Sequence, residues 1–115
     1  MRPPRDRGAV TVEAAIAVGV LVLVIAMGIA GVGAVADQIR CVDAAREAAR
    51  LAARGEPERG RAAAVAIAPR GAAVDIQVAG DTVSVAVRAE PVGGLLPGIE
   101  VSADAYAVAE PGVAP

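Results

Sequence analysis

The feature that most constrains this chain is a run of 23 residues, 14–36, that contains no charged side chain. In a helix with a rise of ~1.5 Å per residue this run extends ~35 Å. A bilayer's hydrocarbon core of about 30 Å requires roughly 20 apolar residues. We therefore predict a transmembrane helix over residues 9–36, crossing with some tilt. Arg2, Arg5 and Arg7 precede it, and a short basic flank favours a cytoplasmic N-terminus with the rest of the chain on the other side.

Glu13 is the one charge that interrupts the apolar pattern at the start of this helix. Two interpretations of it are open. A carboxylate in the first turn is stabilised by the helix dipole and by nearby water. Alternatively, Glu13 awaits a partner charge within the membrane, because ionisable residues at such positions usually serve function.

The order of residues around Glu13 resembles a type IV prepilin signal. Gly8 is followed by apolar residues, by Glu13 at the fifth position after the glycine, and by the long apolar helix. The resemblance implies that a prepilin peptidase cuts between Gly8 and Ala9 on the cytoplasmic side and removes a basic leader, residues 1–8. It also implies that Glu13 pairs with the new amine of Ala9 on a neighbouring subunit.

A second segment resembles the stretch after the helix in TadE-like proteins of the tight-adherence (Flp) pilus system, in the actinobacterial minor-pilin branch. The residues that carry this likeness are Arg40, Cys41, Asp43, Arg46, Glu47 and Arg50. The resemblance spans residues 7–56 and implies a minor pilin or pseudopilin that is not an enzyme. Its partners would be the membrane, the prepilin peptidase, other pilins or pseudopilins, and pilus assembly platform proteins.

Beyond the apolar run, charges recur every three to four residues over 37–55, which predicts an amphipathic extension of the same helix. Three pairs of opposite sign lie three residues apart, each worth a few tenths of a kcal/mol: Asp37/Arg40, Asp43/Arg46 and Glu47/Arg50. We predict one helix from about Ala9 to Arg54, with Gly55 as its C′ residue and Pro57 preventing continuation.

Residues 56–110 are predicted to form a small α+β head, and residues 111–115 a tail. A short helix over 58–68 precedes two segments of alternating apolar residues, 74–78 and 83–87, joined by Gly80-Asp81. A two-residue loop with Gly first suits a type II′ turn and pairs Val78 with Val83, Ile76 with Val85, and Val74 with Val87. After a Gly/Pro-rich loop, alternation over 99–107 predicts a third strand, giving a three-stranded antiparallel sheet. We expect the chain to fray from Glu110 onward.

Small residues and a single cysteine mark further candidate sites. Glycines inside the membrane run let transmembrane helices approach closely, although glycine is also common in such helices; they are Gly19, Gly28, Gly31 and Gly33. Cys41 has two interpretations: an apolar packing residue, or a thiol for an intermolecular disulfide in an exported protein.

Composition argues against several function classes. The chain has no His and one Cys, which excludes internal disulfide frameworks and Cys/His metal sites. A net charge of −2 gives no support for nucleic-acid binding, and no nucleophile–base pair, cofactor motif or small-molecule site is evident. The head's apolar residues are mostly Ala and Val, so its core gains little from each residue buried.

Two other functions remain open at this point. One is a secreted protein whose signal peptide ends at Ala36, after Ala34-Val35, although a run of 23 residues exceeds the ~7–15 of secretory apolar segments. The other is a single-span anchor that displays a small binding module. The N-terminus of the mature protein distinguishes all three.

Overall fold

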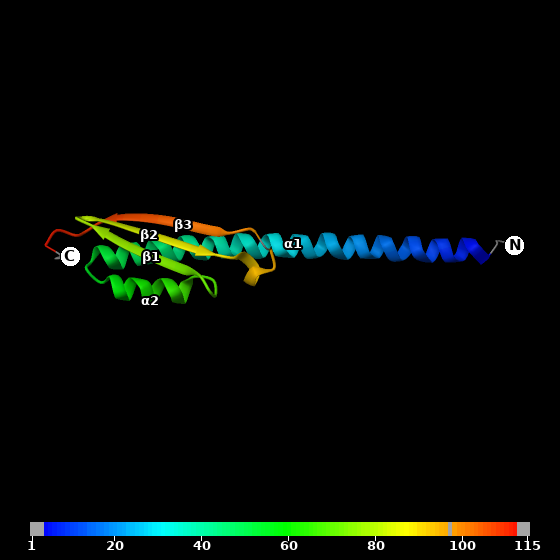
Figure 1. Cartoon of the computed structure of the whole chain (residues 1–115), viewed down its shortest axis with the longest axis horizontal. Helices are drawn as coiled ribbons and strands as arrows, with labels where there is room; N and C mark the ends of the chain where they lie inside the picture. The colour runs from blue at the N-terminus through cyan, green and yellow to red at the C-terminus, as the bar shows by residue number, and fades with distance from the viewer. Residues whose placement is uncertain (1–3, 97, 113–115) are drawn as a thin grey trace. The chain divides into compact units, whose positions relative to one another are not determined.

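The computed structural model describes residues 4–96 and 98–112. Figure 1 shows the elements in chain order: α1 (Pro4–Ala53), α2 (Pro57–Ile67), β1 (Ala73–Ala79), β2 (Thr82–Ala89), the short 3₁₀ turn η1 (Pro91–Gly94) and β3 (Val101–Val108). The predicted α+β fold is confirmed. The chain divides into two compact units, Met1–Gly31 and Val32–Pro115. The head, as we use the term below, is the second unit.

Helix α1 begins at Pro4, five residues earlier than predicted. Proline is well tolerated at the first helical position, and no residue between Pro4 and Ala9 breaks the helix. Its C-terminus confirms the predicted role of Gly55, which has φ +84°. The Gly55 N–H donates to the Ala52 carbonyl (3.0 Å) and the Glu56 N–H to the Leu51 carbonyl (3.1 Å), the two bonds of a Schellman motif.

The sheet is antiparallel with the order β1-β2-β3. The three predicted cross-strand pairs, Val74/Val87, Ile76/Val85 and Val78/Val83, are confirmed, and Gly80 has the positive φ (+64°) that the first position of a type II′ turn requires. Strand β3 begins at Val101, not at Ile99. Gly98 (φ +79°) and a bond from the Ile99 N–H to the Leu96 carbonyl keep the chain in a turn up to that point.

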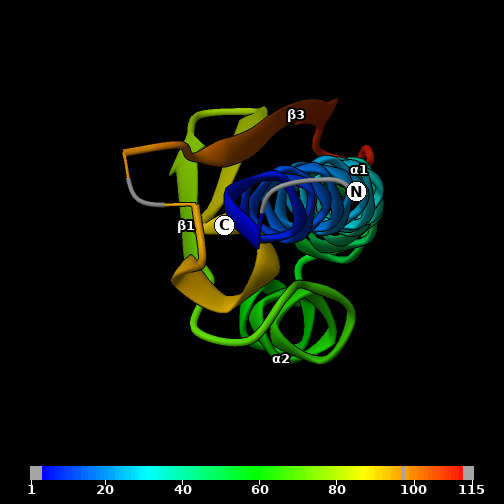
Figure 2. The same cartoon turned by 90° about the vertical axis from the view of Figure 1, so that its right-hand side faces the viewer.

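The core of the head is built from alanines facing valines. The second half of α1 presents one buried face, and the sheet lies against that face (Figure 2). On α1 this face consists of Cys41, Ala44, Ala45, Ala48, Ala49 and Ala52, and β2 contributes Val83, Val85 and Val87. The small alanine side chains let the strands approach the helix axis closely. The single aromatic residue, Tyr106, is 75 % exposed and contributes nothing to this core.

Side chains hold both edges of the sheet. The Gln38 amide donates to the Ser102 carbonyl (2.8 Å) and accepts from the Ser102 N–H (3.2 Å), which satisfies part of the free edge of β3. Arg61 of α2 donates to the Val74 carbonyl at the edge of β1 (2.7 Å). Such contacts occupy backbone groups that would otherwise be open to pairing with another chain.

The C-terminal segment is bound more firmly than predicted. The Glu110 N–H donates to the Ala53 carbonyl at the end of α1 (3.0 Å), and the Glu110 carboxylate lies 3.4 Å from Arg54. The expectation that fraying starts at Glu110 is therefore wrong. Residues 113–115 of the predicted tail lie outside the described residues.

Helix α2 packs on α1 through Gly60, which is fully surrounded. A Cβ atom at this position would lie 2.8 Å from the Ala48 carbonyl oxygen and 3.4 Å from the Ala48 Cα. The neighbouring contact is backbone, which cannot rotate aside. Gly60 therefore sets how closely the two helices approach.

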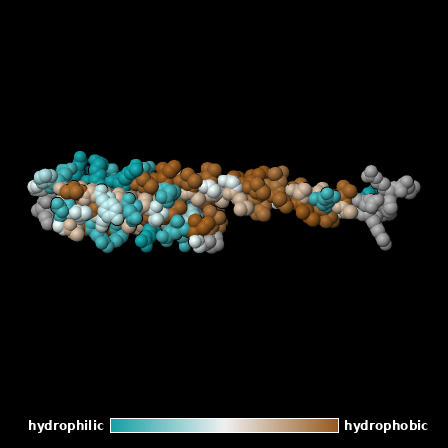
Figure 3. All heavy atoms as spheres, turned by 90° about the horizontal axis from the view of Figure 1, so that it is seen from above, coloured by the Kyte–Doolittle hydropathy of each residue, from teal (hydrophilic) through white to brown (hydrophobic). Residues whose placement is uncertain are grey.

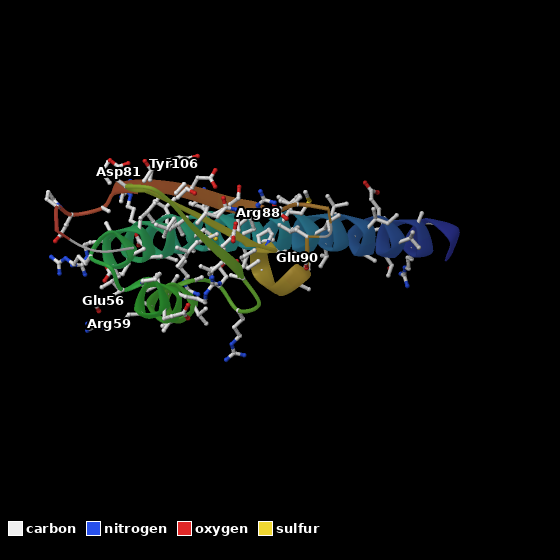
Figure 4. All side chains as sticks on the ribbon, turned by 60° about the vertical axis from the view of Figure 1, so that its left-hand side comes forward. Glu56, Arg59, Asp81, Arg88, Glu90 and Tyr106 are labelled. Carbon is white, nitrogen blue, oxygen red and sulfur yellow. The ribbon has the colours of Figure 1, made fainter. Side chains whose placement is uncertain are left out.

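We expect Gly60→Ala to destabilise the head by about 1–3 kcal/mol, the usual cost of forcing a methyl group into a packed site. Hydrogen exchange of the β2 amides in the full chain measures this. If the site had room, the same change would stabilise the helix by up to ~1 kcal/mol, because alanine has a higher helix propensity than glycine. The sign of the change in stability therefore shows whether position 60 is sterically closed. Arg59→Ala is the control. It removes only the exposed ion pair with Glu56 (Figure 4), worth ~1 kcal/mol at most.

Candidate functional site

The predicted processing signal lies in the first turns of α1. Among the described residues, a Cβ atom at Gly8 would meet nothing within 4 Å. Ala9 and Glu13 are four residues apart, which places them on the same helix face about 6 Å apart in rise. In the described part of the chain Glu13 takes part in no ion pair. Pairing of Glu13 with a charge on another molecule stays a prediction.

Most of the uncharged run of α1 is not covered by other described residues. Its large apolar side chains are between 53 % and 72 % exposed, and they form a surface that is brown in Figure 3, where much of the head is hydrophilic. The helix is long and apolar enough to cross a bilayer. This arrangement fits a single-pass membrane protein.

The four glycines of the run differ in their surroundings. A Cβ atom at Gly19, Gly28 or Gly31 would meet nothing within 4 Å. At Gly33 it would lie 3.2 Å from a methyl carbon of Val92 in the head's own loop. Close packing between transmembrane helices stays a prediction for all four. Gly33 has in addition an internal neighbour that the sequence did not indicate.

Val92 is held in an unusual conformation beside Gly33. It has φ +55° and ψ +39°, a left-handed backbone rare for a β-branched residue and costing about 1–3 kcal/mol. Its N–H donates to the Asp37 carboxylate at 2.7 Å in a partly buried contact. Bonds to charged groups are among the stronger ones in proteins, so Asp37 offsets part of the strain. Asp37 and Gly33, one helical turn apart, together fix the loop on α1.

Cys41 lies in the core of the head and is 0 % exposed. Burial, and secondarily the negative charge of Asp37, raises the pKa of its thiol. A buried thiol with a raised pKa is unreactive. Cys41 therefore serves as a packing residue of the core, and an intermolecular disulfide would require the head to open.

The charged residues of the motif lie on the opposite face of α1 from Cys41. Arg40, Asp43, Arg46 and Arg50 are exposed, and Glu47 is partly buried. The Arg50 guanidinium binds the Glu47 carboxylate through two nitrogens, at 2.6 and 2.9 Å. This hydrogen bond lowers the pKa of Glu47 and raises that of Arg50.

Only one of the three predicted ion pairs on α1 forms in the described residues, and it is Glu47/Arg50. Asp37 bonds the loop instead of Arg40, and Asp43 and Arg46 remain apart. A pair at this spacing contributes only a few tenths of a kcal/mol, which a competing partner easily exceeds.

These charges form one wall of a shallow groove between α1 and α2. The groove is lined by Asp43, Arg46, Glu47 and Arg50 on one side and by Ala63, Ala66 and Ile67 on the other. Within the described residues no group of three or more His, Cys, Asp or Glu could hold a metal ion. The motif combines an inward packing face with an outward charged face.

Comparison with known proteins places this chain in a family. A family model described as TadE-like protein matches residues 8–50, from the candidate processing glycine to Arg50. The chain is 50 % identical over 100 residues to the apoptosis inhibitor Rv3655c of Mycobacterium tuberculosis, covering 87 % of this chain and 78 % of that protein. No solved structure matches. The chain belongs to the TadE-like family.

Proposed function

We propose that this chain is a pilin-like structural subunit, a minor pilin or pseudopilin, used to assemble a tight-adherence pilus or a related secretion apparatus. It is inserted through α1 with the N-terminus in the cytoplasm and the head outside, is cut after Gly8, and then joins other pilins at the assembly platform. The observation that carries the proposal is the family match, which starts at Gly8 and includes Glu13 and the exposed apolar helix.

The surroundings of Gly8 support cleavage at this position. The bond between Gly8 and Ala9 lies within the first turns of α1, and a peptidase needs an extended backbone at the bond that it cuts. Helix ends open at low free-energy cost, and glycine is among the poorest helix formers. Among the described residues no atom lies within 4 Å of a Cβ placed at Gly8, which leaves room for the enzyme.

The structure of the head favours this proposal over a signal peptide ending at Ala36. Helix α1 passes through Ala36 without a break. Gly33 lies against Val92 within the same compact unit, so a cut after Ala36 would strip the head of a contact that helps to fix its strained loop. A generic single-span anchor would need neither Gly8 nor Glu13.

We expect Gly8→Arg to block processing, because a long side chain beside the scissile bond prevents close approach of the peptidase to the backbone. The protein should stay inserted, since the change adds a positive charge to the cytoplasmic flank. Intact mass of the membrane-bound protein measures the outcome. Gly8→Ala is the matched control and should be cut, because the added methyl group is small and meets no neighbour. A Gly8→Arg protein lighter by residues 1–8 would disprove the assignment of this site.

A further inference from the structure

The loop between β2 and β3 carries large apolar side chains that lie outside the core. We call Val92, Leu95, Leu96 and Ile99 the apolar loop surface. Leu95 is 75 % exposed and Ile99 is 51 % exposed, and no charged residue stands between Glu90 and Glu100. Leu95 and Leu96 are also the only leucines in the sequence outside α1. In a head that packs mainly with alanine and valine, Leu95 and Ile99 are thus left on the surface, while Val92 and Leu96 are partly buried.

The position of this loop along α1 indicates what covers it. Counting from Ala14, the roughly 20 residues that a hydrocarbon core requires end at Gly33. The Val92 side chain lies against Gly33. The Val92 backbone N–H donates to the carboxylate of Asp37, the first charged residue after the run. Gly33, Asp37 and Val92 belong to one compact unit. The apolar loop surface is therefore held at the depth where the hydrocarbon ends and the headgroups begin.

The polar residues beside the loop suit a headgroup layer. A groove next to it is lined by Arg70 and Arg88 as well as by Glu90 and Glu100. Figure 4 shows Arg88 and Glu90 at the same end of the sheet, with Asp81 and Tyr106 at the other. Arginine binds phosphate groups through paired N–H donors, and the carboxylates match the positive amine of a zwitterionic lipid.

We propose that the apolar loop surface inserts into the membrane interface from which the head emerges. Leu95 and Ile99 enter the boundary between headgroups and acyl chains, and the Asp37–Val92 bond sets their depth. The occupant is lipid and not a second copy of this chain, because the surface adjoins the last turn of the uncharged run at Gly33, where lipid surrounds an inserted helix. The inference rests on the proposed membrane insertion of α1.

A single tryptophan tests this insertion, because the natural chain contains none. Leu95→Trp and Tyr106→Trp are prepared in the full chain and reconstituted into phosphatidylcholine vesicles whose acyl chains are brominated near the carbonyl end. The two positions are equally exposed, at 75 % each, so they form a matched pair. Leu23→Trp, within the uncharged run, reports separately whether α1 is inserted.

We expect the emission of Leu95→Trp to shift to shorter wavelength and to be quenched by the brominated lipid. Tyr106→Trp should emit as an indole in water and stay unquenched. If Leu95→Trp is not quenched while Leu23→Trp is quenched by bromines deep in the bilayer, α1 is inserted but the loop is not. That result would overturn the loop proposal alone. An unquenched Leu23→Trp would overturn the insertion of α1 as well.

Two other results also bear on the proposal: coverage of the loop by a second copy, and failure of Leu95→Trp to reconstitute. A blue-shifted Leu95→Trp that bromolipid does not quench, and whose shift disappears as protein is diluted in lipid, would show that a second copy covers the loop, and would also overturn the proposal. If Leu95→Trp fails to reconstitute, Ile99→Trp, at a second exposed position of the apolar loop surface, replaces it. Quenching of Ile99→Trp supports the proposal, and its absence overturns it.

Discussion

Val85→Asp is expected to unfold the head while leaving α1 in the membrane. Val85 is 1 % exposed at the centre of β2, between Ile76 and Ala105, and the sheet packs on the alanine face of α1. A carboxylate at this position has no partner, and an uncompensated buried charge costs about 3–5 kcal/mol. A small domain has only about 5–15 kcal/mol of stability in total, and this alanine–valine core gains little per residue. Hydrogen exchange of the β2 and β3 amides in the full chain should show loss of protection.

Two neighbouring changes calibrate this result. Ile76→Asp should cost less than Val85→Asp, because Ile76 lies on the edge strand β1 and is only partly buried. Asp75→Ala, on the exposed face of the same strand, should change stability by ~0.5 kcal/mol or less. Equal protection in all three variants would mean that the buried face of the sheet is assigned wrongly.

Glu13→Ala should be inserted and cut normally but should fail to join filaments. Once the chain is cut after Gly8, Ala9 carries an amine whose reference pKa of about 7.7–8.0 keeps it mostly protonated at neutral pH. In an assembly of apolar helices an unpaired carboxylate or amine is unfavourable, so matching the two sets the axial position of the incoming subunit. A loss of ~1.4 kcal/mol lowers incorporation about tenfold. The measurement is the amount of protein in sheared filaments relative to the membrane level.

Thr11→Ala is the control for this experiment. Thr11 lies on the same exposed part of α1, and within the described residues its hydroxyl donates to the Arg7 carbonyl of its own helix (2.9 Å). It should therefore enter filaments normally. If Glu13→Ala also does so at the wild-type level, the Glu13 carboxylate has no role in assembly.

Features set by local pattern were predictable from the sequence. Alternation of apolar residues, with Gly80 first in a two-residue loop, determines the hairpin register, because a shift by one residue would turn the valines of β2 away from the core. The end of α1 at Gly55 follows from glycine's tolerance of positive φ. Both are decided within a few residues of chain.

Features set by contacts between distant residues were not predictable. Val92 adopts its strained conformation where its side chain packs against Gly33 and its backbone N–H donates to Asp37, both more than fifty residues earlier in the chain. Gly60 is needed because α2 happens to cross α1 at Ala48. Asp37 is the clearest case, since local spacing assigns it to Arg40, whereas a backbone N–H from the loop offers a less exposed and stronger partner. Whether Glu13 acts in assembly depends on a second molecule, which no property of one chain reveals.

The most direct test of the central proposal is the N-terminal sequence of the wild-type protein, purified from the cell envelope. A pilin-like subunit cut after Gly8 should begin at Ala9 and keep the whole uncharged run. A protein that begins at Asp37 would be a secreted protein released by a signal peptidase. A protein that begins at Met1 or Arg2 would be an unprocessed membrane anchor, and either result would contradict the account.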